Sequence, residues 1–183
     1  MSDEPSPPPA VPAVERLDRL GPAACGAALA PLFEDAPRFL ARLCAARPFR
    51  DEAGLFETAR AIAHAMPAPE QLELIDAHPR LGAPPGSVSA HSFVEQGYDR
   101  VRAEAAADAE QARVAAELER LNAAYEARFG FRYCVFVAGR PRAALLPAFE
   151  DSLHADREAE IERALDAVVD IAADRYRKTV APA

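Results

Sequence analysis

His78 and Glu95 are the two side chains in this sequence whose types and positions could do acid–base chemistry together. An apolar run from Leu72 to Ala77 stops at His78, because the proline that follows disfavours a helical conformation in the residue before it. His78 is therefore predicted at a helix end, facing a loop and close to unsatisfied carbonyl groups. A histidine can give or take a proton near neutral pH, and a carboxylate beside it can fix its tautomer.

A second helix is predicted to begin after this break. The connection from Leu81 to Ala90 contains two glycines, two prolines and two serines, which is typical of a loop. The sequence Ser92-Phe93-Val94-Glu95 then has the pattern of a capping box, with Ser92 as the N-cap residue and Glu95 in the first turn. Capping is thus an alternative account of Glu95 that needs no catalytic role.

An arginine lies on the apolar face of the last predicted helix, from about Asp156 to Lys178. Apolar residues recur on one face of this helix at Ile161, Leu165, Val168 and Ala172. Arg175 follows Val168 by seven residues and continues that face. Periodicity alone favours a structural role, a salt bridge or contact with water. The functional alternative is a guanidinium fork that holds a carboxylate or carbonyl of a substrate.

The rest of the sequence predicts a single all-α domain. Helices are expected over residues 14–20, 23–32, 37–47, 52–66, 70–77 and, for most of its length, 92–129. A loop or kink is expected near 107–109, because the apolar positions on its two sides need not be in phase. The segment Phe131 to Val137 has the composition of a strand but no partner strand, so it is predicted to be extended and buried, with backbone groups free for a polar ligand.

Composition limits the domain organisation and the partners. Residues 1–13 are rich in proline and are predicted to be a disordered tail, residues 14–179 the helical domain, and residues 180–183 a C-terminal tail. The net charge of −8 argues against nucleic acid as a partner, and no apolar run is long enough for a membrane span. Three widely spaced cysteines without a CxxC pair indicate a reducing compartment, and with no signal-like N-terminus the expected location is cytoplasmic.

Four short motifs, in this order along the chain, resemble the 2-oxo-4-hydroxy-4-carboxy-5-ureidoimidazoline (OHCU) decarboxylase family. They are Arg47-Pro48-Phe49, His78-Pro79-Arg80-Leu81-Gly82, Ser92-x-x-Glu95-Gln96 and Leu121-Asn122-x-x-Tyr125-x-x-Arg128-Phe129-Gly130-Phe131. The resemblance extends from about Pro31 to Lys178. It implies an all-α fold, usually a homodimer, and the last step from urate to (S)-allantoin, without metal or organic cofactor.

The resemblance also implies roles for particular residues. His78 would be the catalytic acid and Glu95 its catalytic partner, while Arg175 would grip the substrate. The substrate would be lined by Pro79, Ser92, Phe93, Val94, Glu95, Gln96, Tyr133, Cys134, Val135, Phe136 and Val137. Because the substrate of this family carries an imine next to the carbon that loses its carboxylate, the protein need supply only orientation, charge stabilisation and one proton.

Some positions depart from the family pattern. Arg80 stands where the family often has Asp, Tyr133 where it commonly has Phe, and the sequence on both sides of Ser92 to Gln96 is altered. A paralogue that acts on, or only binds, a related ureido or imidazoline acid therefore stays open, as does a helical interaction module. In the module, His78, Glu95 and Arg175 would point apart, whereas in the enzyme they would meet in one pocket. His91 is expected to be an exposed loop residue.

Overall fold

The described structure, a computed structural model covering residues 10–98 and 105–181, is built from helices. No strand occurs within those residues, so the all-α prediction is confirmed. The α-helices are α1 (Val14–Leu17), α2 (Pro22–Leu29), α3 (Pro37–Ala45), α4 (Glu52–Ala65), α5 (Ala68–Asp76), α6 (Ala90–Glu95), α7 (Ala105–Phe129), α8 (Leu146–Ser152) and α9 (Arg157–Thr179). Short 3₁₀ helices are η1 (Ala30–Leu32), η2 (Pro85–Ser87) and η4 (Arg142–Leu145).

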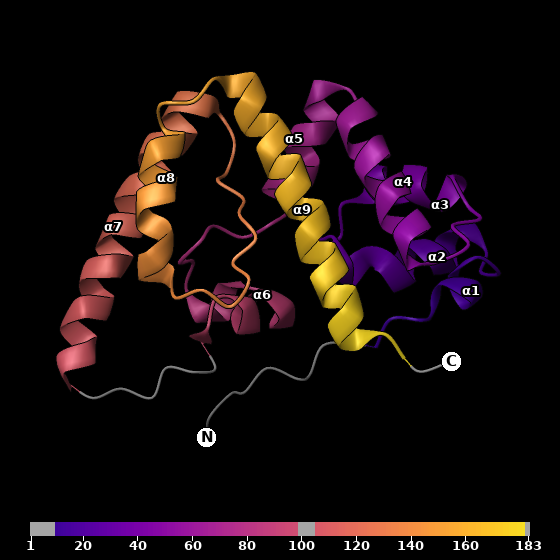
Figure 1. Cartoon of the computed structure of the whole chain (residues 1–183), viewed down its shortest axis with the longest axis horizontal. Helices are drawn as coiled ribbons and strands as arrows, with labels where there is room; N and C mark the ends of the chain where they lie inside the picture. The colour runs from indigo at the N-terminus through magenta and orange to yellow at the C-terminus, as the bar shows by residue number, and fades with distance from the viewer. Residues whose placement is uncertain (1–9, 99–104, 182–183) are drawn as a thin grey trace.

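Helix α9 is the central element of the fold. It runs through the middle of the molecule, with α1 to α5 on one side and α7 and α8 on the other (Figure 1). It packs directly on α4, α5 and η1. The apolar face predicted from periodicity is buried, as Leu165, Val168 and Ala172 are fully inaccessible to solvent. None of the described helices is long and apolar enough to cross a lipid bilayer.

The two ends of the described chain meet. Val11, inside the stretch predicted to be a disordered tail, is only 1% exposed and donates its amide to the carbonyl of Thr179 (3.1 Å). Ala181 in turn donates its amide to the carbonyl of Val11 (2.9 Å). Ordered structure therefore extends past the predicted bounds of 14 and 179 at both ends, because an apolar side chain gains by packing there. Residues 1–9 lie outside the described part.

The predicted capping box at Ser92 is wrong. Helix α6 begins earlier, at Ala90, and its N-cap is Ser89, whose hydroxyl accepts a hydrogen bond from the amide of Ser92 (3.2 Å). Ser89 fits the same preference of helix N-termini for small hydroxyl side chains, three residues upstream. Ser92 is thereby inside the helix and Glu95 is its last residue, so the carboxylate of Glu95 is not used as a cap.

The predicted kink near 107–109 is also wrong. Helix α7 is continuous from Ala105 to Phe129, since its sequence is rich in alanine, glutamate and arginine, all strong helix formers. The interruption lies before it, where α6 ends and Gly97 adopts a φ of 76°. Gly130, with a φ of 78°, ends α7 as predicted.

The segment from Phe131 to Val137 is extended and largely buried, as predicted, and runs between α8 and α9 (Figure 1). Its aromatic residues join a cluster around the fully buried Tyr125 of α7, whose ring lies 5.4 Å from that of Phe131 and 5.2 Å from that of Tyr133. Tyr133 also stacks on Phe149 of α8 (3.7 Å between ring centroids). These contacts fix the segment where it passes α9.

Candidate active site

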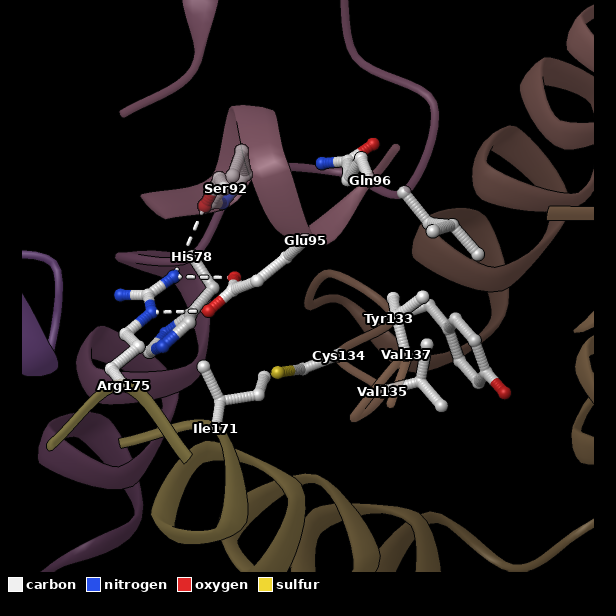
Figure 2. A pocket seen from close by; sticks show the side chains of 12 residues that line it. His78, Ser92, Glu95, Gln96, Tyr133, Cys134, Val135, Val137, Ile171 and Arg175 are labelled. Atoms are coloured by element: carbon white, nitrogen blue, oxygen red, sulfur yellow. Dashed lines mark hydrogen bonds and ion pairs between the residues drawn. The ribbon is translucent and has the colours of Figure 1, made fainter. Parts of the chain in front are cut away.

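A small pocket lies where the end of α5, helix α6, the extended segment and α9 come together (Figure 2). Polar side chains line one side and apolar ones the other. The lining residues are His78, Pro79, Leu81, Ser92, Glu95, Gln96, Tyr133, Cys134, Val135, Val137, Ile171 and Arg175. His78, Glu95 and Arg175 therefore meet in one pocket, as the enzyme hypothesis requires and the interaction-module hypothesis does not.

Three residues predicted to line the substrate are not in this pocket. Phe93 packs on the ring of Tyr98 (5.5 Å), and Val94 is 42% exposed. Phe136, together with Val94, lines a separate small cavity on the other side of Glu95. Alternation explains their positions, because neighbouring residues of a helix or an extended segment point in different directions. Leu81 and Ile171 were not predicted, because isolated apolar residues carry no signal of a pocket.

His78 is a buried, neutral base in this structure. It is 4% exposed, and its Nδ1 lies 3.3 Å from the carbonyl oxygen of Leu74, one turn earlier in α5. A carbonyl only accepts hydrogen bonds, so Nδ1 carries the hydrogen and the neutral ring keeps a lone pair on Nε2. Nε2 is buried and has no hydrogen-bond partner among the residues that the structure describes. Burial, and then the positive charge of Arg175, lower the pKa of His78 to about 4.

Arg175 is only 1% exposed and uses its whole guanidinium group within the protein. Nε and Nη2 donate to the two carboxylate oxygens of Glu95 (2.7 and 2.8 Å), a bidentate pair shown in Figure 2. Nη2 also contacts Glu34 (2.8 Å) and the hydroxyl of Ser92 (3.1 Å). Nη1 donates to the carbonyls of residues 31 and 32, both at 3.2 Å. The salt-bridge account of Arg175 is therefore correct as to its partners, although the pair lies inside the pocket.

Glu34 is a second carboxylate beside Arg175, and sequence reasoning missed it. Its Oε1 accepts hydrogen bonds from the hydroxyls of Ser89 (2.8 Å) and Ser92 (2.7 Å) as well as from Arg175. Burial alone would raise the pKa of Glu34, but the charge of Arg175 and the two serine hydrogen bonds outweigh burial and hold this pKa below its usual value. No local motif marks Glu34, because all its partners come from distant parts of the chain.

Hydrogen bonds from the side-chain amides of Gln96 and Asn122 hold the backbone of the loop after His78. Gln96 accepts from the amide of Gly82 (2.7 Å) and donates to the carbonyl of Arg80 (3.2 Å). Asn122 of α7 donates to the carbonyl of Leu81 (3.0 Å). Gly82 has a φ of 84°, and an added Cβ there would lie 2.8 Å from a methyl carbon of Leu118, so glycine is required. Two of the motif residues, Gln96 and Asn122, thus hold the loop in place.

The backbone groups of the extended segment are partly occupied. The carbonyl of Cys134 accepts from Arg163 of α9 (2.8 Å), and the carbonyls of Phe136 and Val137 accept from Arg140 (2.6 and 3.0 Å). The hydroxyl of Tyr133 points away from His78, Glu95 and Arg175 (Figure 2), so it does not enter the polar side of the pocket.

The lining of the pocket does not include Arg80, His91, Cys25 or Cys44. Arg80 pairs with Glu126 of α7 (Nε to Oε1, 2.6 Å). The prediction that His91 is an exposed loop residue is wrong, since it lies in α6 and is 8% exposed. Cys25, Cys44 and Cys134 are free and buried. Within the described residues, no three His, Cys, Asp or Glu side chains are grouped so that they could hold a metal ion.

These features define a helical protein with a buried histidine, a carboxylate and an arginine in one small pocket, and a second carboxylate bound to that arginine from outside the pocket. The sequence pattern of the OHCU decarboxylase family matches residues 18–177, and the chain belongs to that family. Comparison with curated protein sequences gives no match.

Two solved structures have a similar fold. A crystal structure of (S)-allantoin synthase has a TM-score of 0.63 and 22% identity, with 92% of this chain and 54% of that chain covered. A crystal structure of OHCU decarboxylase in the presence of (S)-allantoin has a TM-score of 0.61 and 24% identity, with 78% of this chain and 90% of that chain covered. The chain thus spans about half the length of the allantoin synthase and most of the decarboxylase.

Proposed function

We propose that this protein decarboxylates OHCU to (S)-allantoin without a metal or organic cofactor, as a step of urate degradation. The single observation that carries the proposal is the buried Nε2 of His78, which has no partner in the described part of the chain and lies in the same pocket as Glu95 and Arg175. A buried polar atom without a partner is costly, and a substrate group would satisfy it. Family membership supports the reaction, and the similar decarboxylase structure in the presence of (S)-allantoin supports the choice of product.

The substrate chemistry needs few protein groups. One ring carbon of OHCU carries a hydroxyl and the carboxylate that leaves, and the next ring carbon is double-bonded to nitrogen. When carbon dioxide departs, the electron pair of the broken C–C bond moves into the imine, and an enol-like intermediate forms. A proton is then added to one face of the former imine carbon, the hydroxyl oxygen becomes the carbonyl of allantoin, and the ring nitrogen takes up a proton from solvent.

His78 is suited to move that proton. The resemblance to the family implied a catalytic acid, but a pKa near 4 leaves the imidazole neutral at pH 7, so it acts first as a base. We propose that Nε2 takes the proton of the substrate hydroxyl as carbon dioxide leaves and then delivers it to the adjacent carbon. Since the ring is fixed by its Nδ1 contact to Leu74, delivery from one side gives one enantiomer.

Glu95 is proposed to bind the substrate and Arg175 to hold Glu95. A carboxylate only accepts hydrogen bonds, so Glu95 suits the N–H and O–H groups of the ureido and hydroxyl substituents. All donor nitrogens of Arg175 are already engaged by the protein, which favours orientation of Glu95 over a direct grip on the substrate. Val135, Val137 and Ile171 form the apolar wall that keeps water from the intermediate.

Binding requires the pocket to open. Its volume is about 30 Å³, roughly the space of one water molecule. A neighbouring cavity of about 50 Å³ shares Glu95, Val135, Val137 and Ile171 with it. We propose that the substrate occupies both cavities after the apolar side chains that line both of them, Val135, Val137 and Ile171, shift outward while Glu95 stays paired with Arg175.

The test is decarboxylation of freshly generated OHCU, followed by circular dichroism of the allantoin formed. The wild-type protein is expected to give one enantiomer well ahead of the spontaneous racemic reaction. His78→Ala should lose at least about 100-fold in rate, in line with the loss of a general acid–base group. His154→Ala, at an exposed histidine distant in sequence from every pocket residue, is the matched control and should keep full activity. A wild-type rate equal to the spontaneous one would refute the proposed reaction.

We further propose that the protein is a cytoplasmic homodimer. The family resemblance supports the dimer, and three free, buried cysteines suit a reducing compartment. Light scattering on the purified protein measures the mass directly, and a monomer would contradict the first part of this proposal.

A further inference from the structure

We propose that Glu34 is a positioning residue of the active site, which locks the guanidinium of Arg175 and the hydroxyl of Ser92 so that the carboxylate of Glu95 keeps one orientation beside His78. Glu34 lines no part of the pocket itself and acts through Arg175. The kinetic part of this inference rests on the proposed decarboxylation and deepens it. A second readout, given below, does not depend on the reaction.

Residues 31–34 supply the hydrogen-bond acceptors for one edge of the Arg175 guanidinium. The carbonyls of Pro31 and Leu32, at the end of η1, accept from Nη1, and the carboxylate of Glu34 accepts from Nη2. Glu34 and Asp35 have φ values of 50° and 59°, in the left-handed region that residues other than glycine rarely adopt. Such local strain persists where surrounding contacts compensate for it, commonly at functional sites.

The opposite edge of the same guanidinium carries Glu95. The guanidinium is planar and rigid, so a contact that fixes the edge with Nη1 and Nη2 also fixes the edge with Nε and Nη2. Nε and Nη2 hold the two oxygens of Glu95 at 2.7 and 2.8 Å. Ser92 adds a second link, because its hydroxyl donates to Glu34 (2.7 Å) and accepts from Nη2 (3.1 Å). Without Glu34, both Arg175 and Ser92 lose a partner that restricts their rotation.

Glu34 also adds charge to the site. Two carboxylates share one guanidinium, which leaves one formal negative charge in excess near His78. The charged groups that act on His78 are Arg175 of α9, Glu34 after η1 and Glu95 of α6. Glu34 and Glu95 both raise the pKa of His78 against the larger lowering effects of burial and Arg175. Removal of the Glu34 charge should therefore lower the pKa of His78 further.

Glu34→Gln tests the inference by kinetics. The amide keeps an acceptor oxygen for Ser89, Ser92 and Arg175 but loses the charge that binds the guanidinium. We expect kcat to fall roughly 10- to 100-fold, the size of effect that misplacement of a catalytic group produces, with little change in KM. The control is Glu70→Gln, which removes a carboxylate from a bidentate pair with Arg42 (2.8 and 3.1 Å) on the surface and should leave kcat unchanged.

Glu34→Asp separates geometry from charge. It keeps the charge but is one methylene shorter, so it should lose kcat while His78 titrates nearly as in the wild type.

In Glu34→Gln, NMR titration of the His78 imidazole in the absence of substrate should show protonation at lower pH than in the wild type. An unchanged His78 titration in Glu34→Gln, or a kcat loss matched by the loss of folded protein, would overturn the inference. If the wild-type protein fails to decarboxylate OHCU, the proposed function falls and the NMR titration alone decides the role of Glu34.

Discussion

The low pKa of His78 arises from its place at the end of α5, since an exposed imidazole would titrate at a higher pH. Its ring is buried, its Nδ1 faces the carbonyl of Leu74, and a guanidinium lies nearby, so the neutral form with a free Nε2 is favoured. An exposed histidine would be partly protonated at pH 6.5. The same buried environment that makes His78 a base therefore also makes it costly to protonate in the folded state.

The cost of protonating His78 should appear in the pH dependence of stability. Because the pKa of His78 is lowered to about 4 by folding, the unfolded chain takes up the proton between pH 6.5 and 4 while the folded protein does not. The wild type should thus lose stability as pH falls through this range. His78→Gln cannot titrate and should lack this contribution. In urea unfolding, the stability of the wild type relative to the variant should fall by about 2 kcal/mol from pH 7 to pH 5. A difference in stability between the two proteins that stays constant with pH would show that folding does not lower the pKa of His78.

At the scale of elements, the extended segment depends on α9 and α7 for its position. Glu160 of α9 is buried and accepts hydrogen bonds from Tyr125 of α7 (2.7 Å) and from Arg163, one turn further along α9 (2.7 and 2.9 Å). Arg163 also holds the carbonyl of Cys134 and lies over the ring of Tyr133 (4.6 Å). One ion pair, between the buried Glu160 and the partly exposed Arg163, therefore connects two helices to the pocket wall.

Removal of Arg163 should be more damaging than removal of the whole ion pair. Arg163→Met leaves the Glu160 carboxylate buried with only Tyr125 as a partner, which is expected to cost about 3 kcal/mol of unfolding free energy. Arg163→Met combined with Glu160→Gln replaces the stranded charge by a neutral amide and should recover a large part of that loss. Urea denaturation of both variants measures the difference. A double variant less stable than Arg163→Met would contradict this account.

At the scale of the whole molecule, the fold is closed by contacts between residues far apart in sequence. Arg175, near the end of α9, is bound by Glu34, while Val11 is hydrogen-bonded to both Thr179 and Ala181. The last turns of α9 therefore join the N-terminal part of the chain to α6 and to the pocket. Stability at the ends of the chain and order in the pocket should be linked.

Deletions at the N-terminus test the contacts between Val11 and the end of α9. The protein without residues 1–9 keeps all the described contacts, so its melting temperature is the reference value. Removal of residues 1–13 also takes away Val11, whose burial and hydrogen bonds are worth about 2–3 kcal/mol, so we expect a fall of roughly 5–10 °C. Differential scanning calorimetry gives both values. Equal melting temperatures for the two truncated proteins would show that the contacts of Val11 contribute nothing.

The sequence by itself determined the helical fold, most of its breaks and most of the residues that line the pocket. Pro48 and Pro79 restrict the backbone locally, and Gly130 permits the positive φ that ends α7. The apolar face of α9 repeats within a few residues, so all these signals can be found without a structure. The family motifs added His78 and Glu95 as candidate catalytic residues. What these signals share is their short range along the chain.

Only the tertiary structure decided the geometry of the site. It placed Ser92 inside α6, turned the hydroxyl of Tyr133 away from the pocket, and bound every donor of Arg175 within the protein. It also brought Glu34 to Arg175. No local rule could supply these results, because each depends on which helices pack together. The protonation state and the hydrogen bonds of a buried side chain are set by neighbours that lie far away in the sequence.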